Sequence, residues 1–165
     1  MGKVHLERAK AVKNDEFYTL FTDVEKIFEI IPNKEDYHFI LPFNDGDSSF
    51  KKYCEINTLD YTSGNKDYKE FNYNIPNALV VSNPPFSKFR ETINFYMFYG
   101  IKFILVAPTH GLTYSNVFNY WKEWKLNLLF LKLEWFKRPD GSKKSMGCYL
   151  LTNLPFYFFN DKETG

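Results

Sequence analysis

The tetrad Asn83-Pro84-Pro85-Phe86 has the residue types that chemistry on an amino group requires. Two consecutive prolines fix the backbone in an extended form and present carbonyls that neighbouring amides do not take up. Asn83 adds a side-chain carbonyl acceptor, and Phe86 adds a flat apolar face. Asn83 Oδ1 and the Pro84 carbonyl can accept the two N–H bonds of an exocyclic amine. This pairing favours a localised nitrogen lone pair, which can then attack a positively charged methylsulfonium in line.

The same tetrad can also serve only as a rigid exit from a strand. Its position favours chemistry, because it directly follows the apolar run 78–82 and opens a helix predicted over 87–99. Ligands of open α/β sheets bind beyond the carboxyl ends of the strands. We therefore predict that all four residues of the tetrad are catalytic.

The elements that must position the tetrad alternate between helix and strand. Apolar periodicity, continuous apolar runs and capping signals predict, in order, helix 23–31, strand 38–42, helix 50–54, strand 55–61, a loose stretch 62–77, strand 78–82, helix 87–99, strand 101–107, helix 114–124 and strands 126–136 and 146–153. Asp140-Gly141 is a strong turn signal between the last two strands. The pattern predicts an α/β fold with a mainly parallel sheet that ends in an antiparallel hairpin.

Composition places the chain among ordinary globular proteins. It has 165 residues, a net charge of +1, 44% hydrophobic and 25% charged residues, which excludes disordered and collagen-like chains. We expect one domain over residues 1–165, with 1–13 as an N-terminal arm. Aromatic residues reach 20%, so some rings can remain for stacking on a ligand.

Cysteine and histidine usage points to a cytoplasmic protein without a metal. Cys54 and Cys148 stand far apart and read as reduced core residues, and the three histidines share no metal-ligand spacing with them. The N-terminus lacks the apolar region of a signal peptide, and no stretch is apolar enough to span a membrane. We expect no contact with a membrane.

Four segments, in the same order, resemble the EcoRI-like adenine-specific DNA methyltransferase family. They are KNDEFYT over 13–19, PFNDGDSSF over 42–50, SNPPFSKFRE over 82–91 and Thr152-Asn153-Leu154. The resemblance implies a Rossmann-like methyltransferase sheet that uses S-adenosyl-L-methionine (SAM). The chain differs from most SAM methyltransferases because the loop after the first predicted strand holds one glycine, Gly46. Family members are longer, and we expect this chain to lack their separate target-recognition region and to have an abbreviated sheet between Asp60 and Ser82.

The resemblance and the predicted strand ends together give candidate cofactor-binding residues: Tyr18, Thr19, Pro42, Phe43, Asn44, Asp45, Asp60 and Asn83. Asp45 could hold the amino group or the ribose hydroxyls of SAM, or it could belong to a solvated turn with Asp47. Asp60 ends a predicted strand, where an acid often bonds ribose hydroxyls, or it could only start a turn.

The last predicted hairpin carries an excess of positive charge. Residues 125–150 contain six lysines and arginines against two acidic residues. Cations beside an aromatic ring suit a surface that contacts phosphates and stacks on a base, and we predict this role for Phe136, Lys137, Arg138, Lys143 and Lys144. The alternative is a solvated hairpin whose charges keep an edge strand from aggregating.

These features favour SAM-dependent methyl transfer to an exocyclic amino group, with adenine N6 in DNA as the acceptor, in a bacterial or phage-infected cell. A second hypothesis is a non-catalytic protein that binds SAM and nucleic acid, or one whose target recognition comes from a protein partner or a second copy. A third hypothesis keeps the chemistry and changes the acceptor to RNA or to a protein glutamine.

Overall fold

A six-stranded sheet in the order β3-β2-β4-β5-β9-β6 forms the centre of the molecule. The computed structural model describes residues 18–43, 48–108, 126–130, 136–137, 143–144, 148–155 and 158–159. The strands are β2 (His38–Leu41), β3 (Tyr61–Ser63), β4 (Ala78–Ser82), β5 (Phe103–Pro108), β6 (Asn127–Phe130) and β9 (Cys148–Thr152). The first four are parallel, while β9 runs antiparallel to both β5 and β6. The predicted α/β sheet with a closing antiparallel pair is confirmed.

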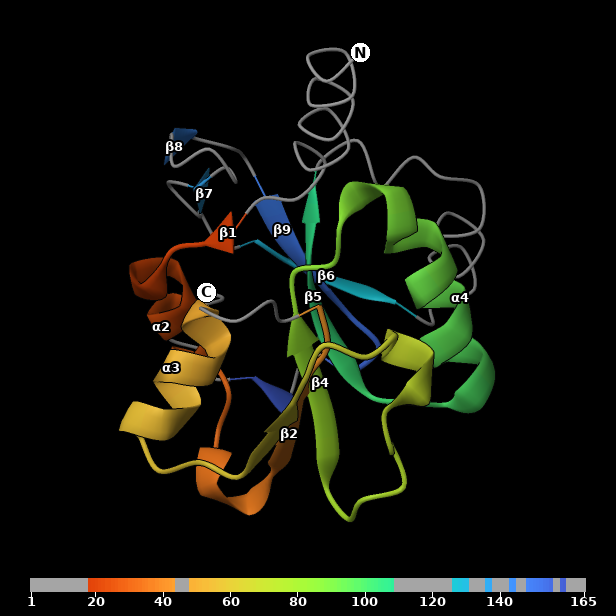
Figure 1. Cartoon of the computed structure of the whole chain (residues 1–165), viewed down its shortest axis with the longest axis horizontal. Helices are drawn as coiled ribbons and strands as arrows, with labels where there is room; N and C mark the ends of the chain where they lie inside the picture. Colours follow the sequence, from red (N-terminus) through yellow and green to blue (C-terminus); the bar gives the residue numbers. More distant parts are fainter. Residues whose placement is uncertain are drawn as a thin grey trace, which may run out of the picture.

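Helices cover both faces of this sheet (Figure 1). Helices α2 (Phe21–Glu29) and α3 (Ser49–Ile56) lie on one side, and α4 (Phe89–Tyr99) lies on the other. Short 3-10 helices connect the larger elements, among them η1 (Lys34–Asp36), η2 (Tyr68–Glu70) and η3 (Phe86–Lys88). Among the helices predicted from the sequence, 23–31, 50–54 and 87–99 are confirmed with shifted ends. The predicted helix 114–124 and arm 1–13 lie outside the described residues.

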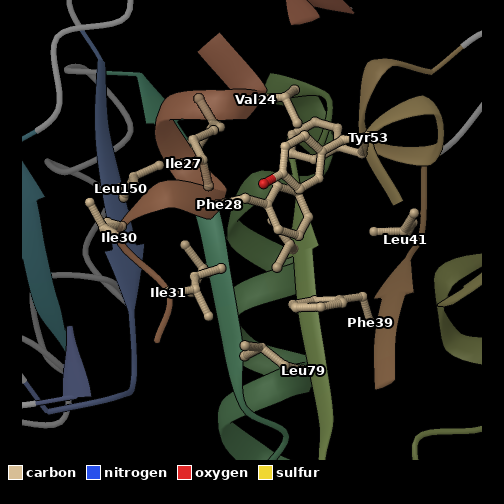
Figure 2. Close-up of a cluster of buried hydrophobic side chains, with 14 of the residues drawn as sticks. Val24, Ile27, Phe28, Ile30, Ile31, Phe39, Leu41, Tyr53, Leu79 and Leu150 are labelled. Atoms are coloured by element: carbon tan, nitrogen blue, oxygen red, sulfur yellow. The ribbon is translucent and has the colours of Figure 1, made fainter. Parts of the chain in front are cut away.

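Successive side chains of the central strands point to opposite faces of the sheet and belong to two separate apolar cores. Phe39 and Leu41 of β2 face α2 and α3, whereas Ile40 faces the core under α4. Phe28 of α2 stacks on Tyr53 of α3 with ring centroids 4.3 Å apart and meets the edge of Phe39 at 5.0 Å (Figure 2). Aromatic pairs in these geometries add about 0.5–1.5 kcal/mol beyond area burial. This packing fixes the direction of β2 and therefore the place where its carboxyl end leaves the sheet.

A second, three-stranded antiparallel sheet joins segments that are far apart in the sequence. It consists of β1 (Tyr18–Thr19), β7 (Phe136–Lys137) and β8 (Lys143–Lys144) in the order β1-β7-β8. The pairing of β7 with β8 agrees with the predicted reversal at Asp140-Gly141, although 138–142 lie outside the described residues. The prediction of one strand over 126–136 is wrong, because β6 and β7 belong to different sheets.

The predicted strand over 55–61 is also wrong. Glu55 and Ile56 form the last turn of α3, and the strand begins only at Tyr61. Ser48 caps this helix by accepting a hydrogen bond from the Phe50 amide at 3.2 Å. Phe50, Tyr53 and Cys54 are buried at helical spacing, and that burial outweighs the alternating pattern that follows them.

The stretch 62–77 is more ordered than predicted. It includes the end of β3 and the helix η2, and it buries Tyr68 and Phe71. The Tyr68 hydroxyl donates to Glu91 Oε2 at 3.0 Å, and the Tyr73 and Tyr96 hydroxyls lie 2.9 Å apart. These contacts attach the segment to α4, so its polar composition conceals a set of buried aromatic anchors.

Candidate functional site

The carboxyl ends of β2 and β4 are tied together by a buried hydrogen bond. Ser82 is the last residue of β4, and its hydroxyl donates to the Pro42 carbonyl at 2.8 Å. Ser82 is 3% exposed, and Pro42 is also buried. A serine at the end of an otherwise apolar strand was the sequence signal for this tie, and it was not interpreted as one. The bond holds the two strand exits side by side at the edge where ligands of α/β sheets bind.

Asn83 follows this tie and is oriented by a residue from the N-terminal segment. Its Nδ2 donates to Thr19 Oγ1 at 3.0 Å. Thr19 is 6% exposed, and Asn83 is half-buried. Because Nδ2 faces Thr19, the amide carbonyl Oδ1 points to the other side. Thr19 was predicted to line the cofactor, and the structure places it against the predicted catalytic amide.

The two prolines of the tetrad behave differently from each other. The Pro85 carbonyl accepts a hydrogen bond from the Lys88 amide at 2.9 Å, so the prediction that neighbouring amides leave it unused is wrong. This bond closes the turn that begins η3, which Pro85 precedes. Within the described part of the chain, no amide donates to the carbonyl of buried Pro84. The backbone of Phe86 opens η3, while the position of its ring lies outside what the structure describes.

The loop after β2 begins with an unusual backbone conformation. Phe43 has φ +60°, in the left-handed region that non-glycine residues rarely adopt. Its ring is half-exposed and lies 5.3 Å from the ring of Tyr68. Strained backbone of this kind clusters at binding and catalytic sites. Asn44 and Asp45, with the neighbouring Asp47, lie outside the described residues.

Asp60 is not where the sequence placed it. It precedes β3 instead of ending a strand, and its carbonyl accepts a hydrogen bond from the Phe39 amide at 2.9 Å. Tyr61 pairs with Phe39 near the start of β2, so Asp60 lies at the amino edge of the parallel sheet. Pro42 and Asn83 lie at the opposite edge. The reason for assigning Asp60 to the cofactor therefore no longer holds.

The predicted nucleic-acid hairpin is adjacent to the tetrad through β1. Tyr18 is paired with Lys137 and Thr19 with Phe136, so the residue that contacts Asn83 belongs to the same sheet as β7 and β8. Of the predicted hairpin residues, Arg138 lies outside the described residues, as do the side chains of Tyr18, Phe136, Lys137, Lys143 and Lys144. The backbone alone brings three candidate regions to one place: the 18–19 segment, the tetrad and the hairpin.

Burial raises the pKa of two side chains, Cys54 and Tyr68, and so keeps both protonated. Burial raises the pKa of the Cys54 thiol to about 12, which keeps this thiol protonated and unreactive, as expected for a reduced core residue. Burial, reinforced by the Glu91 carboxylate, also raises the pKa of Tyr68.

In the described ranges, no group of three His, Cys, Asp or Glu residues is arranged to hold a metal ion. No described helix is long and apolar enough to cross a membrane.

The segment Thr152-Asn153-Leu154 has a structural role at the other end of the sheet. The Thr152 hydroxyl donates to the Phe103 carbonyl at 2.7 Å and accepts from the Leu154 amide at 3.0 Å. Asn153 Oδ1 accepts from the Phe103 amide at 3.0 Å, and its Nδ2 donates to the Ile101 carbonyl at 2.8 Å. These bonds attach the end of β9 to the beginning of β5, away from the tetrad.

Comparison with known proteins supports the reading of these motifs. The family model of the adenine-specific methyltransferase EcoRI matches residues 43–147. The type II methyltransferase M.EcoRI of Escherichia coli is 46% identical over 48 residues, covering 29% of this chain and 15% of the relative. M.MpnI of Mycoplasma pneumoniae is 27% identical over 157 residues and M.MgeORF184P of Mycoplasma genitalium is 26% identical over 159, each covering 74% of this chain and 49% and 50% of the relative.

The chain thus spans about half the length of these two Mycoplasma relatives and a smaller part of M.EcoRI. No solved structure matches it. The family match covers more than half of the chain and includes the tetrad, and the fold has the α/β sheet and closing antiparallel pair that the motifs implied. The chain therefore belongs to the EcoRI family of adenine-specific methyltransferases.

Proposed function

We propose that this chain performs SAM-dependent methyl transfer to an exocyclic amino group, and that the acceptor is adenine N6 in DNA. The observation that carries the proposal is the hydrogen bond from Asn83 Nδ2 to Thr19 Oγ1. It holds the amide at the carboxyl end of β4 with its acceptor oxygen turned away from Thr19. The carbonyl of Pro84, the next residue, is the second acceptor.

In the proposed mechanism, Asn83 Oδ1 and the Pro84 carbonyl accept the two N–H bonds of the target amine. Both acceptors strengthen their bonds as the nitrogen becomes tetrahedral, so they stabilise the transition state more than the bound substrate. Thr19 holds the amide in this orientation and needs no contact with the base. The amine loses its proton after methylation, when the nitrogen is cationic and acidic, and so a strong general base is not required.

The cofactor would lie at the same edge of the sheet and would supply an electrophilic methyl group. The left-handed backbone at Phe43 supports this placement, since it is the conformation that glycine provides where a loop must approach a ligand closely. Tyr18, Pro42 and Phe43 are the described residues of this chain that would hold it, and Thr19 and Asn83 would border it on the side of the acceptor. Asn44 and Asp45 remain predicted contacts.

DNA as the acceptor is supported by the hairpin beside the tetrad. The backbone register brings Lys137 and Lys143 to facing positions. Lysines gathered in this way on one hairpin suit contact with the phosphates of nucleic acid. The target adenine must leave its stack to reach the tetrad, and Phe86 is the proposed stacking partner. A cytoplasmic location and a single domain remain predictions from the sequence.

The test is transfer of tritiated methyl groups from SAM to adenine-containing DNA, single- and double-stranded, with RNA as a comparison. We expect Asn83→Ala to lower turnover by about 10²–10³, by analogy with the loss of one oriented polar group in an oxyanion hole, and to leave SAM affinity largely intact. Asn94→Ala is the matched control, because it removes the same amide from an exposed position of α4. This control should retain wild-type turnover.

Two results would contradict the proposal. If Asn83→Ala transferred methyl groups as fast as the wild type, the tetrad would be only a rigid strand exit. If the wild type bound SAM but methylated no nucleic acid, the non-catalytic or partner-dependent hypothesis would replace it. Transfer to RNA alone would change the acceptor and keep the mechanism.

A further inference from the structure

A hollow of about 620 Å³ lies at the amino edge of the sheet. Residues of the segment 69–78 line one side, and Phe95, Tyr99 and residues 100–102 line the other. Figure 1 shows the end of α4 and the beginning of β5 at the end of the sheet opposite to β1. Ala78 begins β4 and Asn83 follows its end, so a strand of five residues, about 17 Å long, separates the hollow from the tetrad. The volume is within the range of about 300–1,000 Å³ that small-molecule sites occupy.

The polar lining of the hollow favours an anion. It contains two lysines, Lys69 and Lys102, and none of the described residues that line it is acidic. Lys69 Nζ lies 3.7 Å from Glu91 Oε2, a carboxylate outside the lining, whereas Lys102 forms no ion pair with any described residue. Lys102 is exposed at the mouth of the hollow and is the better placed cation for a phosphate.

The apolar lining favours a planar ring. Tyr99 is 63% exposed, and its ring lies 4.8 Å from that of Phe95. A tyrosine ring with this exposure offers a stacking face. Asn72, Asn74 and Asn77 supply amide donors and acceptors within one short segment. Amide groups of this type bond the edges of nucleobases.

The walls of the hollow are fixed by bonds of their own. The Tyr73 hydroxyl lies 2.9 Å from the Tyr96 hydroxyl and also donates to the Tyr68 carbonyl. The Ala78 amide donates to the Ile75 carbonyl at 3.1 Å, and the Ile101 amide donates to the Tyr96 carbonyl at 2.9 Å. A ligand would therefore meet a largely pre-formed surface and would not need to order it, which lowers the cost of binding.

We propose that this hollow is a second binding site, separate from the methyltransferase centre, and that it takes a nucleotide. The base would stack on Tyr99, its edge would bond the asparagine amides, and its phosphate would contact Lys102. The same chemistry could come from a free mononucleotide or from one nucleotide of a single strand. The proposal does not depend on methyl transfer, because no residue of the tetrad lines the hollow.

The test is calorimetric titration of the full chain with thymidine 5′-monophosphate and with a thymidine hexanucleotide. Thymine has no exocyclic amine, so neither probe imitates the proposed acceptor of the tetrad. We expect Tyr99→Ala to weaken binding about 5- to 150-fold, the range for loss of one stacking contact. Phe98→Ala is the control: Phe98 is 80% exposed and does not line the hollow, although its ring meets that of Tyr99 edge-on at 4.8 Å. Its loss should therefore weaken binding far less than the loss of Tyr99.

Lys102→Glu should weaken both probes and should also lower the salt dependence of hexanucleotide binding by about 0.7 log units per log unit of salt. Binding of the mononucleotide would identify a free nucleotide as a sufficient ligand, and binding of the hexanucleotide alone would identify a strand. The proposal is overturned if the wild type binds neither probe, or if Tyr99→Ala binds no more weakly than Phe98→Ala does. Asn83→Ala should keep full affinity, which separates this site from the methyltransferase centre.

Discussion

At the carboxyl edge of the sheet, polar side chains come from separate parts of the chain and bond to groups there. Asn83 follows β4, Thr19 belongs to β1, and Ser82 bonds the carbonyl that follows β2. At the amino edge, the three asparagines around the hollow come from one segment and are exposed. The carboxyl edge therefore has an arrangement that depends on tertiary structure, while the amino edge has one set by a local loop. The first is suited to holding one reactive atom precisely, and the second to binding a ligand.

We expect the largest loss of activity at the carboxyl edge from Thr19→Val. This variant keeps the shape of the side chain and removes the acceptor for Asn83 Nδ2. Leaving such a group without this bond costs about 1–3 kcal/mol, which corresponds to roughly 5- to 150-fold in turnover. We expect kcat to fall and the KM for SAM to stay nearly constant, because Thr19 acts through Asn83. Thr19→Ser should recover most of the turnover, since it restores the hydroxyl.

The measurement is the methyl-transfer assay with kcat and KM determined separately for each variant, supported by a thermal unfolding curve. A merely structural role for Thr19 would lower thermal stability in both variants and leave the kcat of the folded protein unchanged. A rise in the KM for SAM without a fall in kcat would instead restore the original prediction that Thr19 lines the cofactor.

A second pair of variants compares buried hydroxyls at the two edges. Thr152→Val at the amino edge removes a bond to the Phe103 carbonyl and one from the Leu154 amide, and should lower the free energy of unfolding by about 1–3 kcal/mol. Ser82→Ala at the carboxyl edge removes one bond, to the Pro42 carbonyl, and should cost about 1 kcal/mol. Urea denaturation measures both changes.

The two hydroxyls should differ in their effect on activity. Loss of the Ser82 bond releases the exits of β2 and β4 from each other, so turnover per folded molecule should fall. Thr152→Val should leave turnover unchanged, because it lies at the opposite edge. Equal activity in the two variants would mean that the tie between the strand exits does not matter for the tetrad.

These contacts also indicate how far sequence reasoning reaches. The tetrad, the strand before it and the helix after it were predicted because their signals are local: an apolar run, two prolines and helical spacing. The bond between Thr19 and Asn83 joins residues 64 apart, and β1 and β7 have two residues each, too short for any periodic pattern. Such contacts follow from tertiary packing alone.

The predictions for Asp60 and for the stretch 62–77 were wrong for a different reason. The sequence after Cys54 alternates between apolar and polar residues, but the buried aromatic face of α3 extends the helix through Ile56 and delays the strand. That shift of a few residues moved Asp60 from one edge of the sheet to the other. The hollow was likewise not predicted. The polar composition of 62–77 indicated a loose loop, whereas the rings of Tyr68 and Phe71 are buried in the structure.

The smallest expected effect concerns left-handed backbone, which occurs at both edges. Phe43 has φ +60° at the carboxyl edge and Asn77 has φ +61° at the amino edge. Asparagine tolerates this conformation, whereas phenylalanine carries a cost of about 1–2 kcal/mol. Phe43→Ala loses the ring that packs near Tyr68 and keeps the strain, and Phe43→Gly loses the ring and the strain together.

We therefore expect Phe43→Gly to be more stable than Phe43→Ala by about 1 kcal/mol in urea denaturation, although glycine is ordinarily the less stable of the two because its unfolded chain is more flexible. Asn77→Gly, at the matched position, should change the free energy of unfolding by less than this, since asparagine relieves little strain when it is replaced. If Phe43→Ala proved as stable as Phe43→Gly, the surrounding structure would not be holding this residue in the left-handed region. The loop after β2 would then relax without strain, and the reason for placing a cofactor against its backbone would lose its physical support.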